Sequence, residues 1–203
     1  MPKDMFYNIS KEKQDNFLKA ATKEFTQKSY ERASVNSIIK EANISRGSFY
    51  NYFDDLDTLF EYLFEAVKEK RYHNSLGLIK ESNRDLFVFI EKVFRADYKE
   101  FRTDGTYSLF RNYIHYVRNI KKRTIKEEII LPLWKLINSS INISSEFDLS
   151  WIKLPFTELS DVLEMIMIIV VDLFITSETL NFSEEKTMEL FNKRMSIIKK
   201  GIS

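Results

Sequence analysis

Residues 34–60, SVNSIIKEANISRGSFYNYFDDLDTLF, decide the fold of this chain. After Ser34, four apolar residues recur at helical spacing: Val35, Ile38, Ile39 and Ala42. This spacing predicts a short helix at 34–42 with Ser34 as its N-cap, and Ser45 in the same way caps a second short helix that ends near Phe53. Two short helices joined by a three-residue break form the core of a helix-turn-helix, whose second helix can enter the major groove of DNA.

The break begins at Asn43. After glycine, asparagine is the residue that best tolerates the left-handed backbone conformation in which many helices end. We therefore expect Asn43 to terminate the first helix of the pair.

The flanking sequence completes a three-helix head. Ser10 is a plausible cap for a helix at 10–28, and one face of that helix carries apolar residues at helical spacing: Phe17, Leu18, Ala21 and Phe25. Residues 1–9 read as a short arm. Asp54, Asp55 and Asp57 open a fourth helix that extends to about Arg71, because acidic residues suit the positive end of the helix dipole.

The remainder also reads as helical, with pieces at 83–102, 106–120, 122–140, 157–178 and 184–200. We expect Asn83 to open the first of these and Ser183 to cap the last, while Pro132 should kink or split the third. Residues 142–155 lack periodicity and read as a loop. The predicted fold is all-α, with about nine helices, divided into a DNA-binding helix-turn-helix domain at 1–55 (the head) and a ligand-binding and dimerisation bundle at 56–203 (the body).

Composition agrees with helices and excludes several chemistries. Among 203 residues there are only 4 Gly and 3 Pro, although turn-rich β folds and nucleotide-binding α/β folds both use Gly in turns. The absence of Cys excludes disulfides, thiolate metal sites and thiol nucleophiles, and it fits a cytoplasmic protein. The N-terminus lacks the apolar run of a signal peptide, and the apolar stretch 162–175 is too short to span a bilayer, so no membrane association is expected.

The head resembles the DNA-binding region of the TetR family of regulators. The family's first-helix pattern corresponds to these residues: Phe17, Leu18, Ala20, Ala21, Phe25 and Tyr30. Its second helix matches Ser34, Val35, Ile38 and Ile39. Its third helix, Ser-x-Gly-Ser/Thr-apolar-Tyr-x-Tyr/His-Phe, corresponds here to residues 45–53, SRGSFYNYF, and a leucine in the next helix matches Leu59. The resemblance covers about 50 residues and implies a transcription regulator.

Two positions depart from the family pattern. Asn43 stands where the family has Gly, and Leu56 stands where a family Lys often reaches a phosphate. Asp54 and Asp55 add negative charge beside Leu56. The helix start there could still offer backbone N–H groups to a phosphate.

The chemistry of the head suggests which residues meet DNA. Ser45 and Ser48 are short donors, Gly47 allows close backbone approach, and Arg46 can fork onto guanine or pair with a phosphate. Tyr50 can reach a phosphate or a thymine methyl. The full predicted set is Ser34, Asn36, Ser37, Ser45, Arg46, Gly47, Ser48, Tyr50, Asn51 and Tyr52, whereas Phe49 and Phe53 should be core.

Net charge supports DNA binding modestly. Residues 10–53 carry eight basic and five acidic side chains, a balance of +3, whereas the whole chain is at +1. Affinity for DNA should therefore depend on salt.

A dimer is expected because one short recognition helix reads few base pairs, and two heads must lie about 34–36 Å apart to read successive turns. The helix at 157–178 is apolar nearly all the way round and must be covered on several sides. Together with the last helix it is the predicted dimer surface, with these contact residues: Leu163, Ile166, Met167, Val170 and Phe174.

A sensing pocket is expected among the middle helices, which are rich in aromatic residues. Such a lining suits a small hydrophobic or aromatic effector, although aromatic residues at helical spacing are also ordinary core. The predicted ligand-binding residues are Phe94, Tyr98, Phe101, Phe110, Tyr113, His115 and Trp134.

No catalytic constellation, cofactor motif or metal-ligand spacing is present, so the sequence predicts neither an enzyme nor a cofactor. The expected function is that of a ligand-responsive repressor that binds a pseudo-palindromic operator as a homodimer. Two alternatives stay open: an adaptor protein that keeps the head without binding DNA, supported by Leu56 and its acidic neighbours, and an all-helical enzyme.

Overall fold

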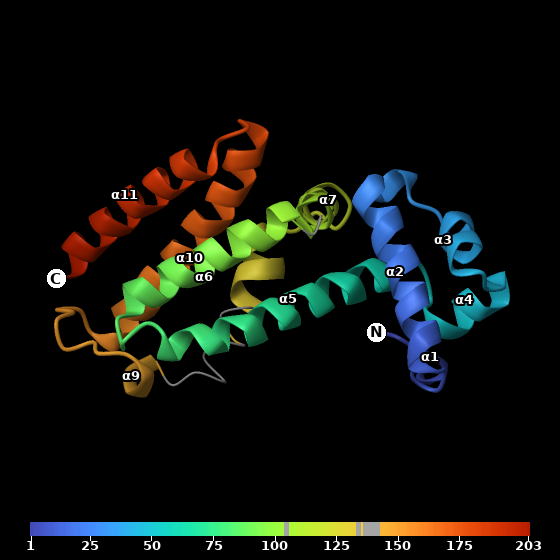
Figure 1. The fold of residues 1–203 in the computed structure, drawn as a ribbon, viewed down its shortest axis with the longest axis horizontal. Helices are drawn as coiled ribbons and strands as arrows, with labels where there is room; N and C mark the ends of the chain where they lie inside the picture. The colour runs from blue at the N-terminus through green and yellow to red at the C-terminus, as the bar shows by residue number, and fades with distance from the viewer. Residues whose placement is uncertain (104–105, 133–134, 136–142) are drawn as a thin grey trace. The chain divides into compact units, whose positions relative to one another are not determined.

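The computed structural model describes residues 1–103, 106–132, 135 and 143–203, and all regular structure in these ranges is helical (Figure 1). This confirms the predicted all-α class. The chain forms two compact units: Met1–Lys70 with Phe101–Lys122, and Arg71–Glu100 with Arg123–Ser203. The long helix α5 (Leu56–Lys80) contributes to both.

The first unit contains the helix-turn-helix. Its elements are α1 (Asp4–Tyr7), α2 (Lys11–Gln27), η1 (Tyr30–Arg32), α3 (Val35–Ala42), α4 (Arg46–Tyr52), the beginning of α5, and α7 (Thr106–Asn119). Ser10, Ser34 and Ser45 accept hydrogen bonds from backbone N–H groups three residues ahead, as predicted for N-caps. Asp55 caps α5 by accepting from the Thr58 N–H at 2.8 Å.

The N-terminal residues are a helix and not the arm that the sequence suggested. The Phe6 side chain of α1 is fully buried, with its ring centroid 5.3 Å from that of Phe53 and 6.0 Å from that of Phe17. Edge-to-face contacts of this kind stabilise an aromatic cluster beyond the area that they bury. Phe6 is therefore part of the head's core.

Helix α7 is fastened to the C-terminal end of α2. The buried Asn112 amide nitrogen donates to the carbonyl oxygens of Phe25 at 2.7 Å and Lys28 at 2.9 Å. The last carbonyls of a helix have no partner within the helix, and here a side chain from α7 satisfies two of them at this end. The contact joins a head helix to a helix that follows it by some 80 residues in sequence.

A polar cluster lies between α5 and α7. The Tyr116 hydroxyl donates to Glu61 Oε1 at 3.3 Å, and the Lys121 ammonium lies 2.8 Å from the same oxygen. Asp57 Oδ1 is buried without a hydrogen-bond partner in the described part of the chain. Burial, reinforced by the Glu61 charge and partly opposed by Lys121, raises the pKa of Asp57. Burial also raises the pKa of the Tyr116 phenol far above its usual value, so this hydroxyl stays protonated.

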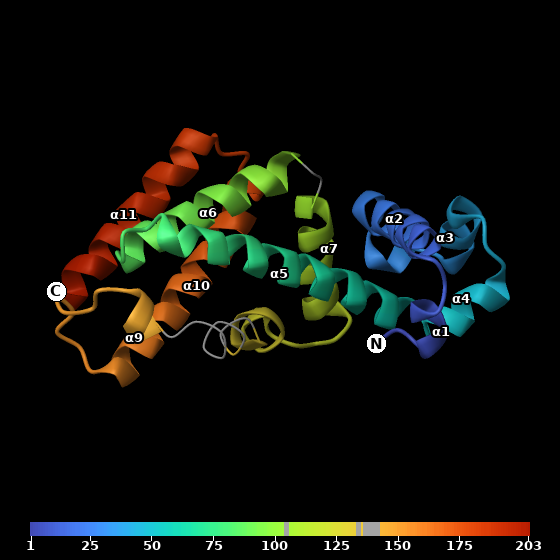
Figure 2. The same ribbon diagram turned by 60° about the horizontal axis from the view of Figure 1, so that its bottom comes forward.

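The second unit packs α6 (Leu86–Thr103, as far as Glu100), α10 (Phe156–Thr179) and α11 (Glu184–Ile202) around aromatic rings; α10 and α11 lie against each other (Figure 2). Phe94 stacks on Phe191 at 4.2 Å between ring centroids. Arg71 forms a two-pronged ion pair with Asp97 and lies over the Phe174 ring. Ser183 caps α11 as predicted.

Several predicted boundaries were wrong for local reasons. Helix α5 continues nine residues beyond Arg71, and α6 begins at Leu86 because Asp85, and not Asn83, accepts the first N–H groups. Asn83 and Arg84 both have left-handed backbones, with φ of 51° and 63°. The helix predicted at 122–140 contains a π-helical turn, η2 (Lys126–Ile130), and Pro132 follows it after one residue; proline has no N–H to donate to the α-helical ladder. The stretch predicted as a loop holds one helical turn, α9 (Ile143–Glu146).

Within the described residues, no helix combines the length and the apolar character needed to cross a bilayer.

Replacing Phe6 with Ala should lower the free energy of unfolding by about 3–5 kcal/mol, because the change empties a fully buried aromatic site. Urea denaturation followed by circular dichroism measures this. Met5→Ala is the matched control: the Met5 side chain is 53% exposed, so its loss should cost under about 0.5 kcal/mol. Equal effects of the two changes would contradict the role of α1 in the core.

Replacing Asp57 with Asn should raise the melting temperature at neutral pH by about 2 °C. Folding raises the pKa of Asp57, so any stabilisation from its protonated form is present at low pH and is lost as pH rises through the raised pKa. The gain in Asp57→Asn should shrink as pH falls toward 3.8, the ordinary value, and Asp161→Asn at an exposed site should show no such trend. Scanning calorimetry across this range tests the pattern, which a pH-independent gain would contradict.

Candidate nucleic-acid interface

Helices α3 and α4 form the predicted helix-turn-helix, and Asn43 makes the turn between them. Its φ of 52° and ψ of 50° are left-handed, and its N–H bonds back to the carbonyls of Ile39 and Lys40. The N–H of Ile44 donates to the Ile39 carbonyl at 3.0 Å, which closes the end of α3. The expectation that Asn43 serves the backbone role of glycine is confirmed.

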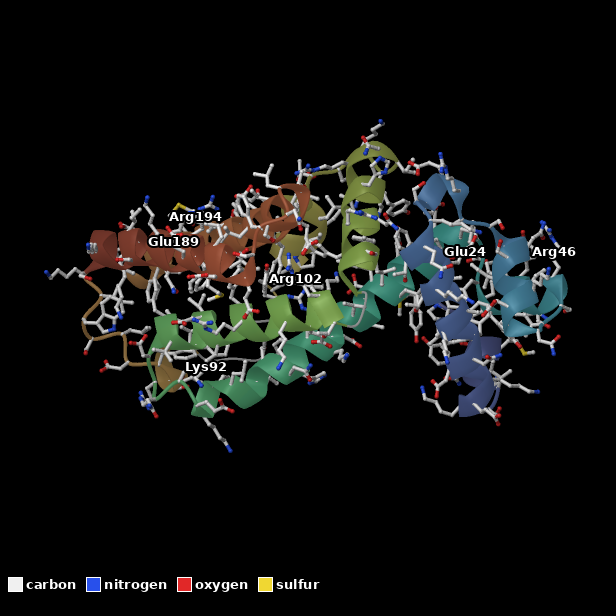
Figure 3. All side chains as sticks on the ribbon, turned by 45° about the horizontal axis from the view of Figure 1, so that its top comes forward. Glu24, Arg46, Lys92, Arg102, Glu189 and Arg194 are labelled. Atoms are coloured by element: carbon white, nitrogen blue, oxygen red, sulfur yellow. The ribbon has the colours of Figure 1, made fainter. Side chains whose placement is uncertain are left out.

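The start of α3 is fixed by α2. Glu24 is buried on α2, and its Oε1 accepts from the Ser34 N–H at 2.9 Å and from the Lys28 ammonium at 2.8 Å. A buried carboxylate needs such donors to offset its lost hydration. Glu24, labelled on α2 in Figure 3, therefore helps to fix where α3 begins.

Three predicted DNA-contacting residues come together on the surface. Arg46 on α4 donates to Asn36 Oδ1 on α3 at 2.8 Å and to the Tyr50 hydroxyl at 3.4 Å, and its guanidinium lies 5.7 Å from the Tyr50 ring centre. All three side chains are exposed, and Arg46 forms no ion pair with any carboxylate in the described ranges. A planar cation held by neutral partners keeps its charge available to a phosphate or a guanine edge.

Gly47 is exposed beside this cluster and has no steric need to be glycine. A Cβ built on it meets only the Ser45 hydroxyl, at an ordinary 3.7 Å. Because a glycine inside a helix costs stability, its presence here fits a requirement from outside the chain, namely close approach of a ligand to the backbone.

The other predicted contacts divide between exposed and buried positions. Ser45, Ser48 and Asn51 lie on or near the surface, whereas Ser34 and Ser37 are half-buried and bonded to each other at 2.9 Å. Phe49 and Phe53 are fully buried, as expected.

Tyr52 is a correction to the predicted DNA contacts. Its side chain is 9% exposed and its ring packs edge-on against Phe6 and Phe17, so it is part of the core and not of the DNA-facing surface. The reason is α1, which the sequence did not reveal and which covers that side of α4.

The predicted ligand-binding residues come from both units. Phe94 and Tyr98 belong to the second unit, where the Tyr98 hydroxyl lies 3.2 Å from the Thr187 hydroxyl. Phe101, Phe110 and Tyr113 are buried in the first unit, where Tyr113 stacks on Phe64 at 3.7 Å between centroids. Trp134 lies outside the described residues.

His115 lies exposed on α7 and is not buried among the aromatic residues. Its Nδ1 lies 3.3 Å from Glu31 Oε1 on η1. Hydrogen bonds from the backbone N–H of Glu31 and the Ser29 hydroxyl, with a smaller contribution from His115, hold the pKa of Glu31 below its usual range.

Most of the predicted dimer residues are already buried by contacts within their own chain. Leu163, Ile166 and Phe174 are at most 7% exposed, so they pack inside their own subunit. Met167 and Val170 are half-buried. The apolar side chains that α10 presents to solvent are instead Met165, at 50% exposed, and Ile168, at 43%. A helix that is apolar on every face gives no sign in the sequence of which face turns outward.

Sequence reasoning missed three residues that the structure brings forward. Lys3 contacts the end of α4, Asn112 fastens α7 to α2, and the buried Tyr72 hydroxyl has no hydrogen-bond partner among the described residues. Of these three, only Tyr72 could have been noticed in the sequence, because it is an aromatic residue on a long predicted helix.

Known proteins share this architecture. Residues 17–63 match the family described as "Bacterial regulatory proteins, tetR family". The chain is 28% identical over 134 residues to the "Uncharacterized HTH-type transcriptional regulator YhgD" of Bacillus subtilis (strain 168), a match that covers 57% of this chain and 70% of that protein. It is also 35% identical over 68 residues to the "Uncharacterized HTH-type transcriptional regulator YuxN" of the same organism. This match covers 34% of this chain but only 23% of YuxN.

A solved structure agrees over most of the length. The crystal structure of a TetR family transcription regulator from Marinobacter aquaeolei VT8 superposes with a TM-score of 0.63 at 19% identity, over 91% of this chain and 94% of that one, and so shares the fold. The turn at Asn43, the exposed face of α4 and the family match over 17–63 converge on one assignment. These findings support a DNA-binding transcription regulator whose residues 17–63 match the tetR family.

Proposed function

We propose that the chain is a ligand-responsive repressor that binds a pseudo-palindromic operator as a homodimer in the cytoplasm. The observation that carries the proposal is the exposed cluster of Asn36, Arg46 and Tyr50 beside Gly47, a glycine without an intramolecular reason. Polar and cationic side chains at the start of a short exposed helix suit phosphates and base edges in a major groove.

In this proposal the DNA contacts come from the ends and outer faces of α3 and α4. Arg46 and Asn36 read base edges or a phosphate, while Ser45 and Ser48 add hydroxyl donors. Gly47 brings the backbone N–H groups of α4 close to the sugar–phosphate chain. The adaptor alternative has no comparable account of Gly47.

A second copy is proposed to cover the outward faces of α10 and α11. Met165 and Ile168 on α10 and Ile197 on α11, which is 63% exposed, supply apolar area that a soluble helix pair usually buries. A two-fold pairing of these two helices would present two heads in opposite orientations, as a palindrome requires.

The effector is proposed to be small and hydrophobic or aromatic, and to act through α7. Phe110 and Tyr113 sit on this helix two residues or fewer from Asn112, which holds the carbonyls at the end of α2. A ligand that displaces these rings would move Asn112 and hence the end of a head helix. Ligand and DNA must then weaken each other's binding by the same factor. Turnover of a substrate has no support in any side-chain arrangement described above, and we propose no enzymatic activity.

Replacing Gly47 with Ala should stabilise the free chain by roughly 0.5–1 kcal/mol, because Ala is the better helix former and nothing obstructs its methyl group. The same change should weaken DNA binding by at least about tenfold, since the methyl group separates the backbone from DNA. Fluorescence anisotropy with a duplex selected by the wild-type protein from a random pool measures the affinity, and a urea melt measures the stability. Wild-type affinity in this variant would contradict the proposed contact.

Arg46→Ala in the same assay should weaken binding by about tenfold to a hundredfold and lower the salt dependence of affinity. Arg118→Ala is the matched control, because it removes an equal charge from the exposed face of α7. An equal loss in both variants would indicate general electrostatics in place of a defined contact. Failure of the wild type to bind any duplex would favour the adaptor.

Replacing Ile168 with Glu should raise the dimer dissociation constant by at least about tenfold, because a carboxylate would be buried at the pairing surface. Light scattering coupled to size-exclusion chromatography at several concentrations measures this. Val88→Glu introduces the same charge at a site that is 38% exposed on α6 and should leave the dimer intact. A dimer that is unaffected by the change at 168 would place the interface elsewhere.

A further inference from the structure

Lys3 lies against the C-terminal end of α4 and makes three polar contacts there. Its backbone N–H donates to the Tyr52 carbonyl at 2.8 Å, and its ammonium donates to the Tyr50 carbonyl at 2.9 Å. The ammonium also lies 2.7 Å from Asp54 Oδ1. One residue thus engages two of the last carbonyls of α4 and the first carboxylate after it.

These contacts meet two needs of a short helix. The final carbonyls of α4 have no partner within the helix, and a cation at that end suits the negative pole of the dipole. Helix α4 has seven residues, so its ends lie only about 10 Å apart. This length is close to the Debye length of about 10 Å at 0.1 M salt, so salt screens charges at this separation only in part. An unpaired carboxylate at Asp54 would therefore repel phosphates bound near Arg46.

The neighbouring structure holds Lys3 in place. Lys3 precedes α1, and its carbonyl accepts the Phe6 N–H at 2.9 Å, while the Phe6 ring is fully buried and contacts rings of α2, α4 and α5. The Lys3 side chain is itself 42% exposed, and that of Asp54 is 63% exposed. Exposed ion pairs contribute little to stability, so the consequence of this pair should be seen in binding rather than in folding.

We propose that Lys3 is a positioning residue for DNA recognition: it closes the C-terminal end of α4 and cancels the charge of Asp54, which would otherwise repel the DNA backbone. The inference rests on the DNA-binding role proposed for α4. It also explains how the chain tolerates an acidic residue two positions after the end of α4.

The test compares four proteins on a duplex selected by the wild type from a random pool: wild type, Lys3→Met, Asp54→Asn and the double variant. Methionine keeps the length and the backbone N–H but removes the ammonium. Lys3→Met should weaken binding by about tenfold. Asp54→Asn should restore most of this loss in the double variant, because the carboxylate that Lys3 neutralises is then absent.

Lys11→Met is the control for loss of one positive charge, since Lys11 is paired with Asp15 on α2 at 3.0 Å and touches neither α4 nor Asp54 in the contacts above. It should change affinity by less than about twofold. Melting temperatures of all variants should stay close together, and rescue by Asp54→Asn is a readout that a purely structural role for Lys3 would not give.

Two results would overturn the inference. Lys3→Met could bind as tightly as wild type, or it could lose affinity that Asp54→Asn does not restore, which would indicate a direct phosphate contact by Lys3. In both cases wild-type binding itself stays intact, so the proposed function survives. Absence of wild-type binding would instead overturn the proposed function, and this inference with it.

Discussion

The aromatic core under α4 is the constraint on which the reading surface depends. Phe49 and Phe53 are anchored against Phe17 and Phe6, so one side of a seven-residue helix is fixed and the opposite side must face solvent. A helix this short has little intrinsic stability in water. Its orientation therefore comes from packing and from the groups that satisfy its two ends, Ser45 at the first and Lys3 at the second.

The connection between the head and the later helices is polar and directional. Asn112 donates to two carbonyls at the C-terminal end of α2 and is buried, so a displacement of α7 would break both bonds away from water. Such a contact is made in one geometry and lost in another, in contrast to an apolar contact that can slide. Two discrete arrangements are what the proposed ligand-dependent release from DNA would require.

Much of the head could be predicted from sequence because its signals are local. Caps at Ser34 and Ser45, the turn at Asn43 and the buried Phe49 and Phe53 each follow from neighbours within a few residues. Helix α1 could not be predicted, because its four residues make only about one turn. An apolar pattern is recognised only when it recurs over several turns. The burial of Tyr52 then followed from that omission.

The body resisted prediction for a different reason. Helix α10 is apolar on all faces, so its sequence shows that it is covered but not by what; Leu163 turned inward and Met165 outward. The aromatic residues of α6 and α7 belong to both units, and their assignment to a pocket stays a prediction. Burial depends on contacts between distant segments, which periodicity within one segment does not carry.

The distribution of indole rings has a practical consequence. Both tryptophans, at 134 and 151, come late in the sequence, and Trp151 packs beside Phe87 with the Lys199 ammonium 5.0 Å from its ring centre. The aromatic residues of the helix-turn-helix are tyrosines and phenylalanines, with no tryptophan. Tryptophan fluorescence will therefore report on the second unit and not on unfolding of the first. A denaturation study of this regulator needs a backbone signal, such as far-ultraviolet ellipticity, to follow the helix-turn-helix.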